Sequence, residues 1–306
     1  MRIGVDLGGT KIEIIALDDN GNEQLRERRA APRHDYDATI SAIRDLVCNA
    51  EERLGITCTI GIGIPGTISA STGLVKNANS TWLNGHPFDR DIGAVLNRKV
   101  RTANDANCFA LSESKDGAGK GQQCVFGVIA GTGVGSGICI SGQIISGAHA
   151  IGGEWGHNPL PWPKRDELPG TNCYCGKQGC IETWCSGPAL ERQFFELSGK
   201  ERDAKAIAEL YDNGDNTAKI IIEAFFDRMA RALAGIVNVL DPDIIVLGGG
   251  LSNIDTLYTE LPSRILPYTF HAEAPSLVVK NHHGDSSGVR GAAWLWGEHE
   301  RSGLAP

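Results

Sequence analysis

Two glycine-turned hairpins, one at the start of the chain and one near its middle, constrain the fold most. The first, MRIGVDLGGTKIEIIALDDNG, reads as two strands joined at Gly8 and Gly9, and the second is FGVIAGTGVGSGICISGQI. Superposing Gly4 on Gly127 brings Gly8 onto Gly131 and aligns the apolar residues of the returning strands. Two such units predict a duplicated chain with a cleft between the copies, although any two glycine-rich hairpins can align this well.

Strands and helices alternate along the rest of the chain. Apolar residues recur at helical spacing in 37–54, a second helix is expected at 218–240, and ITCTIGIGIPG and DIIVLGGGLS read as buried strands that end in turns. The fold class is therefore α/β. The length of 306 residues allows two lobes. We expect a small lobe at 1–118, a large lobe at 119–287, and a C-terminal helix at about 288–306 that returns to the small lobe.

Composition and charge exclude several classes of protein. A net charge of −8 argues against a nucleic-acid surface built on bulk basicity. No apolar run approaches the ~18 residues that cross a bilayer, and no signal-peptide pattern opens the chain. We therefore expect a cytoplasmic protein that binds neither nucleic acid nor membranes. In that compartment the nine cysteines favour free thiols or metal ligands over a disulfide framework.

Three glycine turns, DLGGTK, GTGVGSG and GGG, follow apolar strands and could hold phosphate groups. Glycine lets backbone N–H groups approach a phosphate closely, but a turn between strands often needs glycine for its geometry alone. The pattern is neither a Walker loop nor a dinucleotide fingerprint, since Lys120 lacks a following Ser or Thr and GTGVGSG enters a strand. Asp6 precedes the first turn, where its carboxylate could hold Mg²⁺ or cap the turn. Thr10 and Lys11 add a hydroxyl and a counter-charge.

The hexapeptide ANDANC places Asn104 and Asp105 where a strand runs into a helix. A carboxylate there could accept the proton of an alcohol during phosphoryl transfer, which is worth roughly 10² to 10⁴ in rate. Either residue could instead serve as an ordinary helix N-cap. Taken alone, the hexapeptide favours the cap.

The segment TNCYCGKQGCIETW holds three cysteines, Cys173, Cys175 and Cys180, in the pattern C-x-C-x₄-C. Zn²⁺ needs four nitrogen or sulfur ligands, and His157 in GGEWGHNPLP is the nearest histidine upstream. A C-x-x-C redox pair is absent, and a C-x-C disulfide would be strained. We therefore predict a zinc site, with buried thiols and a redox switch as alternatives.

Together, DLGGTK, IPG, ANDANC, GTGVGSG, GGEWGH and CYCGKQGCIE resemble the ROK family, which groups sugar kinases and sugar-responsive repressors. The match covers nearly the whole chain in order, and E-x-G-H followed by C-x-C-G-x-x-G-C-x-E is its most specific part. The resemblance implies an actin-like, ribonuclease-H-like fold of two lobes that binds Mg²⁺ and ATP between them. It also implies a homodimer.

The resemblance assigns roles to residues. Asp105 is the expected general base. His157 would bind zinc through one ring nitrogen and turn the other to the sugar, so zinc would act as a structural brace. The expected sugar contacts are Gly66, Asn104, Asp105, Glu154, His157 and Glu182. The expected ATP and Mg²⁺ contacts are Asp6, Gly8, Gly9, Thr10, Lys11, Thr132, Gly133, Gly249 and Gly250.

The expected activity is ATP-dependent phosphorylation of a hexose at its 6-hydroxyl group. The segments NANSTWLNGHPF and GHNPLPWP look most similar to bacterial ROK fructokinases of the mannofructokinase type, acting on fructose and also mannose. N-acetylglucosamine kinase and glucokinase are the near alternatives, because hexoses differ by only one or two hydrogen bonds. A ROK repressor is disfavoured since the first hairpin begins at residue 3 and leaves no room for a helix-turn-helix module. An intact Asp105 disfavours a sensor without catalysis.

Overall fold

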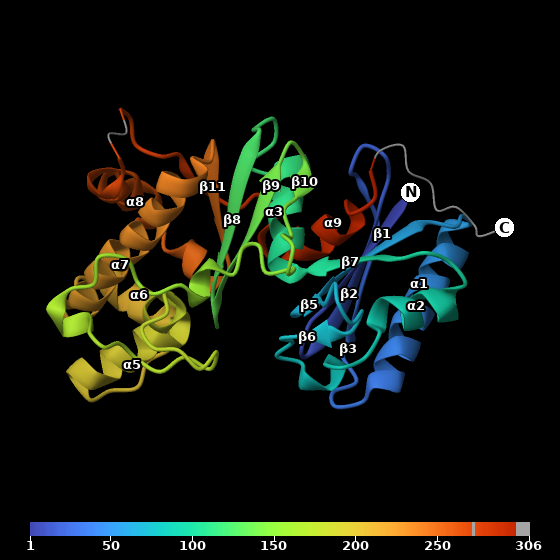
Figure 1. Ribbon diagram of the computed structural model, residues 1–306, viewed down its shortest axis with the longest axis horizontal. Helices are drawn as coiled ribbons and strands as arrows, with labels where there is room; N and C mark the ends of the chain where they lie inside the picture. The colour runs from blue at the N-terminus through green and yellow to red at the C-terminus, as the bar shows by residue number, and fades with distance from the viewer. Residues whose placement is uncertain (271–272, 298–306) are drawn as a thin grey trace.

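Two five-stranded sheets of equivalent topology form the framework of the computed structural model, which describes residues 1–270 and 273–297 (Figure 1). The strand orders are β3-β2-β1-β4-β7 and β10-β9-β8-β11-β12. In each sheet an antiparallel hairpin, β1–β2 or β8–β9, is continued by two parallel strands. The repeated order supports the predicted duplication. The first sheet comprises β1 (Arg2–Leu7), β2 (Lys11–Leu17), β3 (Glu23–Ala30), β4 (Thr59–Ile64) and β7 (Arg101–Asn104); the second comprises β8 (Cys124–Ala130), β9 (Val134–Ile140), β10 (Gln143–Ile144), β11 (Ile244–Gly248) and β12 (Val278–Lys280).

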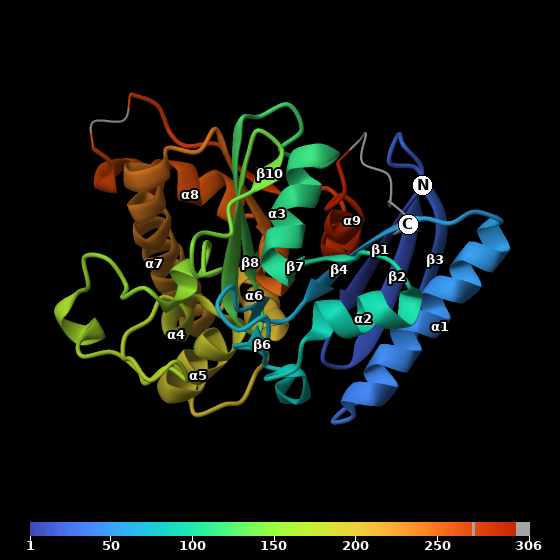
Figure 2. The same ribbon diagram turned by 45° about the vertical axis from the view of Figure 1, so that its right-hand side comes forward.

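Side chains alternate along β1 between the two faces of the first sheet. Ile3, Val5 and Leu7 belong to a buried cluster that includes the apolar stripe of α1 (Tyr36–Leu54). The intervening residues, Gly4 and Asp6, point to the opposite face, because side chains alternate along a strand. Figure 2 shows α1 and α2 (Phe88–Leu96) together on the outer side of this sheet, next to a small hairpin of β5 (Thr67–Ile68) and β6 (Val75–Lys76).

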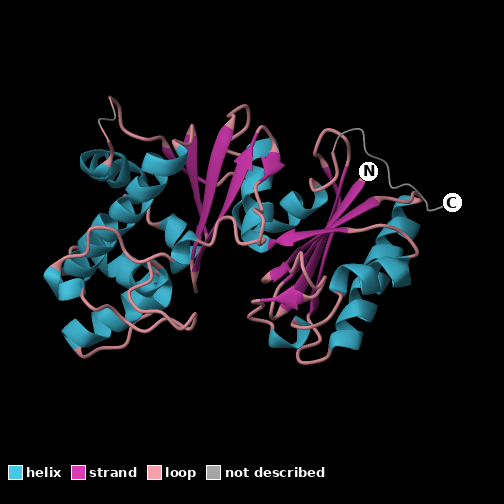
Figure 3. Cartoon of the chain, viewed as in Figure 1, coloured by secondary structure: helices cyan, strands magenta, loops and turns pink. Residues whose placement is uncertain are grey.

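Helices cover the outer side of the second sheet as well (Figure 3). The longest, α7 (Asn216–Leu240), begins at its N-cap Asp215, whose side chain accepts from the backbone N–H of Ala218. The predicted helices at 37–54 and 218–240 are therefore present as α1 and α7. The other helices beside the second sheet on this side are α4 (Glu182–Cys185), α5 (Gly187–Ser198), α6 (Ala204–Asp212) and α8 (Leu257–Ile265). Within the described ranges, no helix is both long enough and apolar enough to cross a bilayer.

Two helices, α3 (Asp105–Lys115) and α9 (Ser287–Ala293), lie between the sheets (Figure 1). Helix α3 packs on α9 and on β8 and β9, while α9 packs on β1, β2 and β4. Glycines permit this approach: a Cβ atom on Gly61 would lie 1.8 Å from the Ala292 carbonyl oxygen, and one on Gly291 would lie 1.6 Å from that of Cys108. The predicted C-terminal helix is thus present as α9 and packs on the first sheet. Residues 298–306 of the predicted range lie outside the described residues. The lobe boundaries stay a prediction.

Candidate active site

The junction between β7 and α3 brings together three of the predicted sugar contacts. Asn104 is the N-cap of α3, and its Oδ1 accepts from the backbone N–H of Ala106 at 2.9 Å. Its Nδ2 donates to the carbonyl oxygen of Gly66 at 3.1 Å. The capping role therefore belongs to Asn104, which leaves Asp105 as the first residue of the helix.

The carboxyl group of Asp105 lies in a poorly hydrated, electronegative environment. Its Oδ1 accepts from the backbone N–H of Ala106 at 2.8 Å. The residue is exposed as a whole, but protein atoms surround the carboxyl group closely. This loss of hydration, with the nearby charge of Glu154, raises the pKa of Asp105 above its usual value. A raised pKa makes this carboxylate a stronger proton acceptor than an ordinary aspartate.

Asp6, on β1, lies beside β4 and α9 and within electrostatic range of Asp105. A Cβ atom on Gly63 would lie 3.7 Å from Asp6 Oδ1, and one on Gly288 would lie 3.8 Å from it. Loss of hydration, followed by repulsion from Asp105 and Glu13, raises the pKa of Asp6 to about 7. Carboxylates whose charges repel each other gain from a divalent cation, and oxygen ligands of this kind suit Mg²⁺.

The three predicted phosphate turns have distinct geometries. In the first turn the Gly8 N–H donates to the Lys11 carbonyl oxygen at 2.9 Å, and a Cβ atom on Gly9 would come within 3.4 Å of Ser80 Oγ. In the second, the Gly131 N–H donates to the Gly133 carbonyl oxygen at 2.9 Å. Gly249 in the third turn has φ of 81°, and its Cβ would lie 2.5 Å from the backbone oxygen of Ala130. Only glycine fits there.

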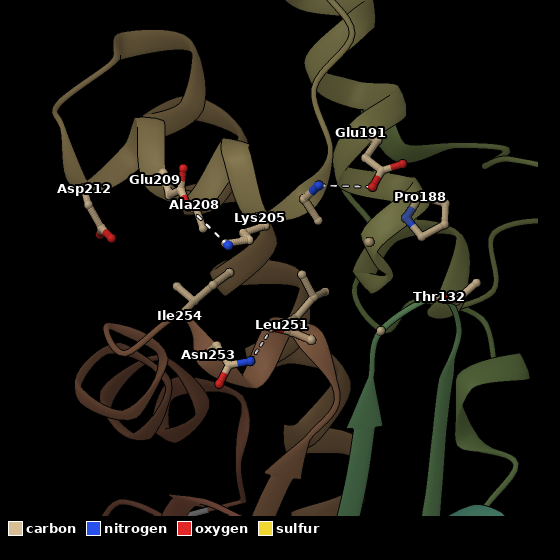
Figure 4. A pocket seen from close by; sticks show the side chains of 14 residues that line it. Thr132, Pro188, Glu191, Lys205, Ala208, Glu209, Asp212, Leu251, Asn253 and Ile254 are labelled. Atoms are coloured by element: carbon tan, nitrogen blue, oxygen red, sulfur yellow. Dashed lines mark hydrogen bonds and ion pairs between the residues drawn. The ribbon is translucent and has the colours of Figure 1, made fainter. Parts of the chain in front are cut away.

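A cavity of about 850 Å³ opens beside the second and third turns (Figure 4). Thr132 and Gly250 line it as predicted for ATP contacts, whereas Gly133 and Gly249 are not among its lining residues. Side chains from α5, α6 and the 3₁₀ turn η4 (Gly250–Asn253) complete the wall, with Pro188, Lys205 and Asn253 facing the cavity in Figure 4. Its volume lies in the range of ligand pockets, roughly 300–1,000 Å³. Sequence reasoning missed α5 and α6, because no motif marks them.

The four predicted zinc ligands converge. One donor atom from each of His157, Cys173, Cys175 and Cys180 lies within 4.8 Å of all the others. His157 Nδ1 is 3.5 Å from Cys173 Sγ, and the Sγ atoms of Cys175 and Cys180 are 3.6 Å apart. Tetrahedral Zn²⁺ with ordinary bond lengths would separate such atoms by about 3.5 Å and about 3.8 Å. The donor set and its spacing therefore fit zinc, and none of the three thiols forms a disulfide.

The zinc motif, which comprises residues 154–157 and 171–184, also carries the remaining predicted sugar contacts. With Nδ1 of His157 turned to the cysteines, its Nε2 lies 4.0 Å from Glu154 Oε2. Glu182, two residues after Cys180, begins α4, and its Oε2 accepts from the Val134 N–H at 2.9 Å. The same oxygen would lie 2.6 Å from a Cβ atom on Gly133. The zinc motif is thereby joined to the second glycine turn.

Comparison with known proteins identifies the family. The model of the ROK family matches residues 2–299. The chain belongs to the ROK family. Its curated relatives include the N-acetyl-D-glucosamine kinases of Yersinia pseudotuberculosis and Pectobacterium atrosepticum, each 39% identical and covering 96% of this chain and 98% of the relative.

Solved ROK structures share the fold. The ROK hexokinase from Thermus thermophilus superposes with a TM-score of 0.85 at 29% identity, covering 96% of each chain. A ROK family glucokinase from Streptomyces griseus, solved with glucose and AMPPNP, gives 0.75 at 27% identity over 96% of this chain and 98% of its own. The predicted family and its actin-like, two-lobed α/β fold are confirmed. The comparisons support a sugar kinase of this family, and the curated relatives named above are N-acetyl-D-glucosamine kinases, whereas the sequence resemblance implies a fructokinase.

Membership in the ROK family leaves the residue roles as predictions, but the structure brings most of the residues together. Asp6 is electrostatically coupled to Asp105, Asp105 to Glu154, and Glu154 lies beside His157. Asp6, Asp105 and the pair of Glu154 and His157 come from three segments that are far apart in the sequence. Tyr174, which also contacts His157, was missed because nothing in its spacing distinguishes it from the other residues between the cysteines.

Proposed function

We propose that the chain is an ATP-dependent hexose kinase that transfers the γ-phosphoryl group of ATP to the terminal hydroxyl of a hexose. The observation that carries this proposal is the position of Asp105: a carboxylate with a raised pKa at the start of α3, within the electrostatic reach of Asp6 and Glu154. The nucleotide would occupy the cavity beside the second and third turns.

The proposed reaction is a direct displacement at phosphorus. Asp105 accepts the proton of the sugar hydroxyl as that oxygen forms a bond to the γ-phosphorus, and the bond between this phosphorus and the β,γ-bridging oxygen breaks to release ADP. Asn104, Glu154, His157 and Glu182 would hold the other sugar hydroxyls. Asp6 would hold Mg²⁺, which would neutralise phosphate charge.

The names of the curated relatives favour N-acetyl-D-glucosamine as the acceptor. Fructose stays the alternative acceptor, because the segment 77–88 resembles ROK fructokinases. The loop 77–87 belongs to this segment and lies directly against Gly66. A Cβ atom added to Gly66 would be 2.6 Å from the Ala78 nitrogen. Asn84 fixes that loop by accepting from the Ala78 N–H and donating to its carbonyl oxygen, both at 2.9 Å. This loop therefore borders a predicted sugar contact, and its side chains are candidates to influence which hexose binds.

We also infer a structural zinc ion held by His157, Cys173, Cys175 and Cys180. Its role is to fix the imidazole and, through the short segment after Cys180, the carboxylate of Glu182. The ion would contribute position and not Lewis acidity. The homodimer, the cytoplasmic location and the lobe boundaries stay predictions.

An ADP-release assay on the purified protein tests this function. Fructose, mannose, glucose and N-acetyl-D-glucosamine are compared by kcat/KM in the presence of Mg·ATP, with the Asp105→Asn variant as the inactive control. The highest kcat/KM identifies the acceptor and decides between N-acetyl-D-glucosamine and fructose. No turnover above that control with any of the four sugars would refute the hexose kinase.

A further inference from the structure

A tyrosine on the zinc motif stands at the predicted sugar contact. Tyr174 lies between Cys173 and Cys175, and its hydroxyl is 3.0 Å from His157 Nε2. The two rings meet edge to face, with centroids 5.1 Å apart and an interplanar angle of 90°. Of the two ring nitrogens of His157, Nδ1 is directed at the cysteines, so Nε2 is the one available to a sugar.

Each imidazole nitrogen makes one hydrogen bond in the plane of the ring. Nε2 of His157 already has a partner in Tyr174. If Nδ1 binds a metal, Nε2 carries the proton and donates it, and the oxygen that receives it is the phenol oxygen. A sugar hydroxyl can therefore take this hydrogen bond only after the phenol leaves.

The other neighbours of the phenol are predicted sugar-binding groups as well. The carboxylates of Glu182 and Glu154 are near enough to the phenol to act on it electrostatically. Glu154 Oε2 is itself 4.0 Å from His157 Nε2. The hydroxyl thus lies near three side chains from two segments of the chain, Glu154 and His157 from one and Glu182 from the other, which is where a polyhydroxylated ligand would lie.

The side chain of Tyr174 lies at the protein surface. It is 83% exposed, whereas the flanking Cys173 is buried and held by the backbone hydrogen bond from its N–H to the Lys177 carbonyl oxygen at 2.8 Å. Rotation about the tyrosine side-chain bonds would carry the phenol into solvent without moving the cysteines. The cost is one hydrogen bond and one ring contact.

We propose that Tyr174 is a displaceable occupant of the sugar site, whose hydroxyl holds His157 Nε2 until a hexose hydroxyl replaces it. This inference rests on the proposed hexose kinase function. It makes Tyr174 a determinant of sugar affinity: the sugar must compete with a group of the protein for one hydrogen bond. Removing the hydroxyl removes the competitor and leaves the imidazole in place.

Calorimetric titration of each of the four hexoses into the wild type and the Tyr174→Phe variant tests this. A hydrogen bond has a net value of about 0.5–1.5 kcal/mol, so Tyr174→Phe should bind its hexose about 2- to 12-fold more tightly. The control is Tyr36→Phe, which removes a hydroxyl bonded to Asp91 at 2.7 Å in the contact between α1 and α2 and should leave affinity unchanged. An unchanged or weaker affinity in Tyr174→Phe would overturn the proposal, weaker binding showing that the phenol contacts the bound sugar.

A second measurement separates this inference from the proposed function. The ¹⁵N resonance of His157 Nε2 in the sugar-free protein should shift in Tyr174→Phe and not in Tyr36→Phe, whatever sugar the protein binds. No shift would show that the hydrogen bond is absent in solution and would reject the occupant. A wild type that binds none of the four hexoses would reject the function itself, whereas a wild type that binds one with no gain in Tyr174→Phe rejects only the role of Tyr174.

Discussion

Replacing Asp6 by asparagine should stabilise the nucleotide-free protein at alkaline pH. Asp6 lies beside β4 and α9 with its charge poorly hydrated and repelled by Asp105 and Glu13. These effects outweigh the attraction of Lys11 and Arg28, and the pKa rises from 3.8 to about 7. The ionised carboxylate therefore costs folding free energy, while an amide of the same shape carries no charge.

The size and sign of the effect follow from the pKa. A shift of about 3 units corresponds to about 4 kcal/mol at about 1.4 kcal/mol per unit, and partial access to solvent makes about 2–4 kcal/mol the expected range. Because the folded state binds the proton more tightly than the unfolded state, stability falls as pH rises from 3.8 to about 7. Below pH 3.8 Asp6 is protonated in both the folded and the unfolded state, so it no longer makes stability depend on pH.

Urea unfolding of the wild type and Asp6→Asn at pH 4 and pH 8 measures the effect. The gain in free energy of unfolding caused by Asp6→Asn should be about 2–4 kcal/mol larger at pH 8 than at pH 4. Packing effects that are the same at both pH values cancel in this difference. Asp19→Asn, at a side chain 80% exposed beyond the other end of the same hairpin, should show no such difference. An equal effect of Asp6→Asn at the two pH values would refute the electrostatic explanation.

Three further predictions concern the base, the metal and a buried ion network. Asp105→Asn should lower kcat by about 10²- to 10⁴-fold with hexose affinity retained in calorimetry, and near-normal turnover would place the base elsewhere. Elemental analysis should find about one zinc per chain, lost in Cys175→Ser but kept in Cys48→Ser; equal zinc in both variants would exclude Cys175 as a ligand. Hydrogen bonds from Arg231 and Arg228 offset the burial of Glu167 and lower its pKa to about 2. Glu167→Gln should therefore lower the free energy of unfolding in urea by about 3–5 kcal/mol at pH 7. The wild type should lose this stability only as pH falls from 4.5 toward 2. A loss of less than about 1 kcal/mol in Glu167→Gln at pH 7 would contradict this.

Elements with a one-sided apolar pattern could be predicted from the sequence. The apolar periodicity of the β1–β2 hairpin, the β8–β9 hairpin and α1 is visible in consecutive residues. The apolar positions of that pattern are the ones that the structure buries. By contrast β3, with the sequence EQLRERRA, buries only Leu25. It is an edge strand, so its charged side chains face solvent or pair with Glu13, and no apolar alternation marks it.

The same distinction holds in the candidate site. Three cysteines within eight residues and a histidine upstream restrict the metal ligands so strongly that spacing alone indicates the set. The cavity wall on α5 and α6 depends on how two amphipathic helices pack beside distant turns, which a linear pattern does not record. Tyr174 was missed for a third reason, since its role depends on which way one exposed side chain turns.

Helix α3 connects the chemistry to the duplication of the fold. Its first residue is Asp105, and near its other end the buried Glu113 accepts from Ser287 Oγ at 2.7 Å and from the His282 N–H at 3.0 Å. Asp116, just after the helix, accepts from Arg290 and from Trp294 Nε1. Because α3 packs on the second sheet and α9 on the first, these contacts join the two copies at the end of α3 remote from the base. The contact also reaches toward the base, since a Cβ atom on Gly291 of α9 would lie 1.6 Å from the carbonyl oxygen of Cys108, about one helical turn from Asp105. The contact between the two copies therefore runs along α3 from Glu113 to within one turn of the proposed base.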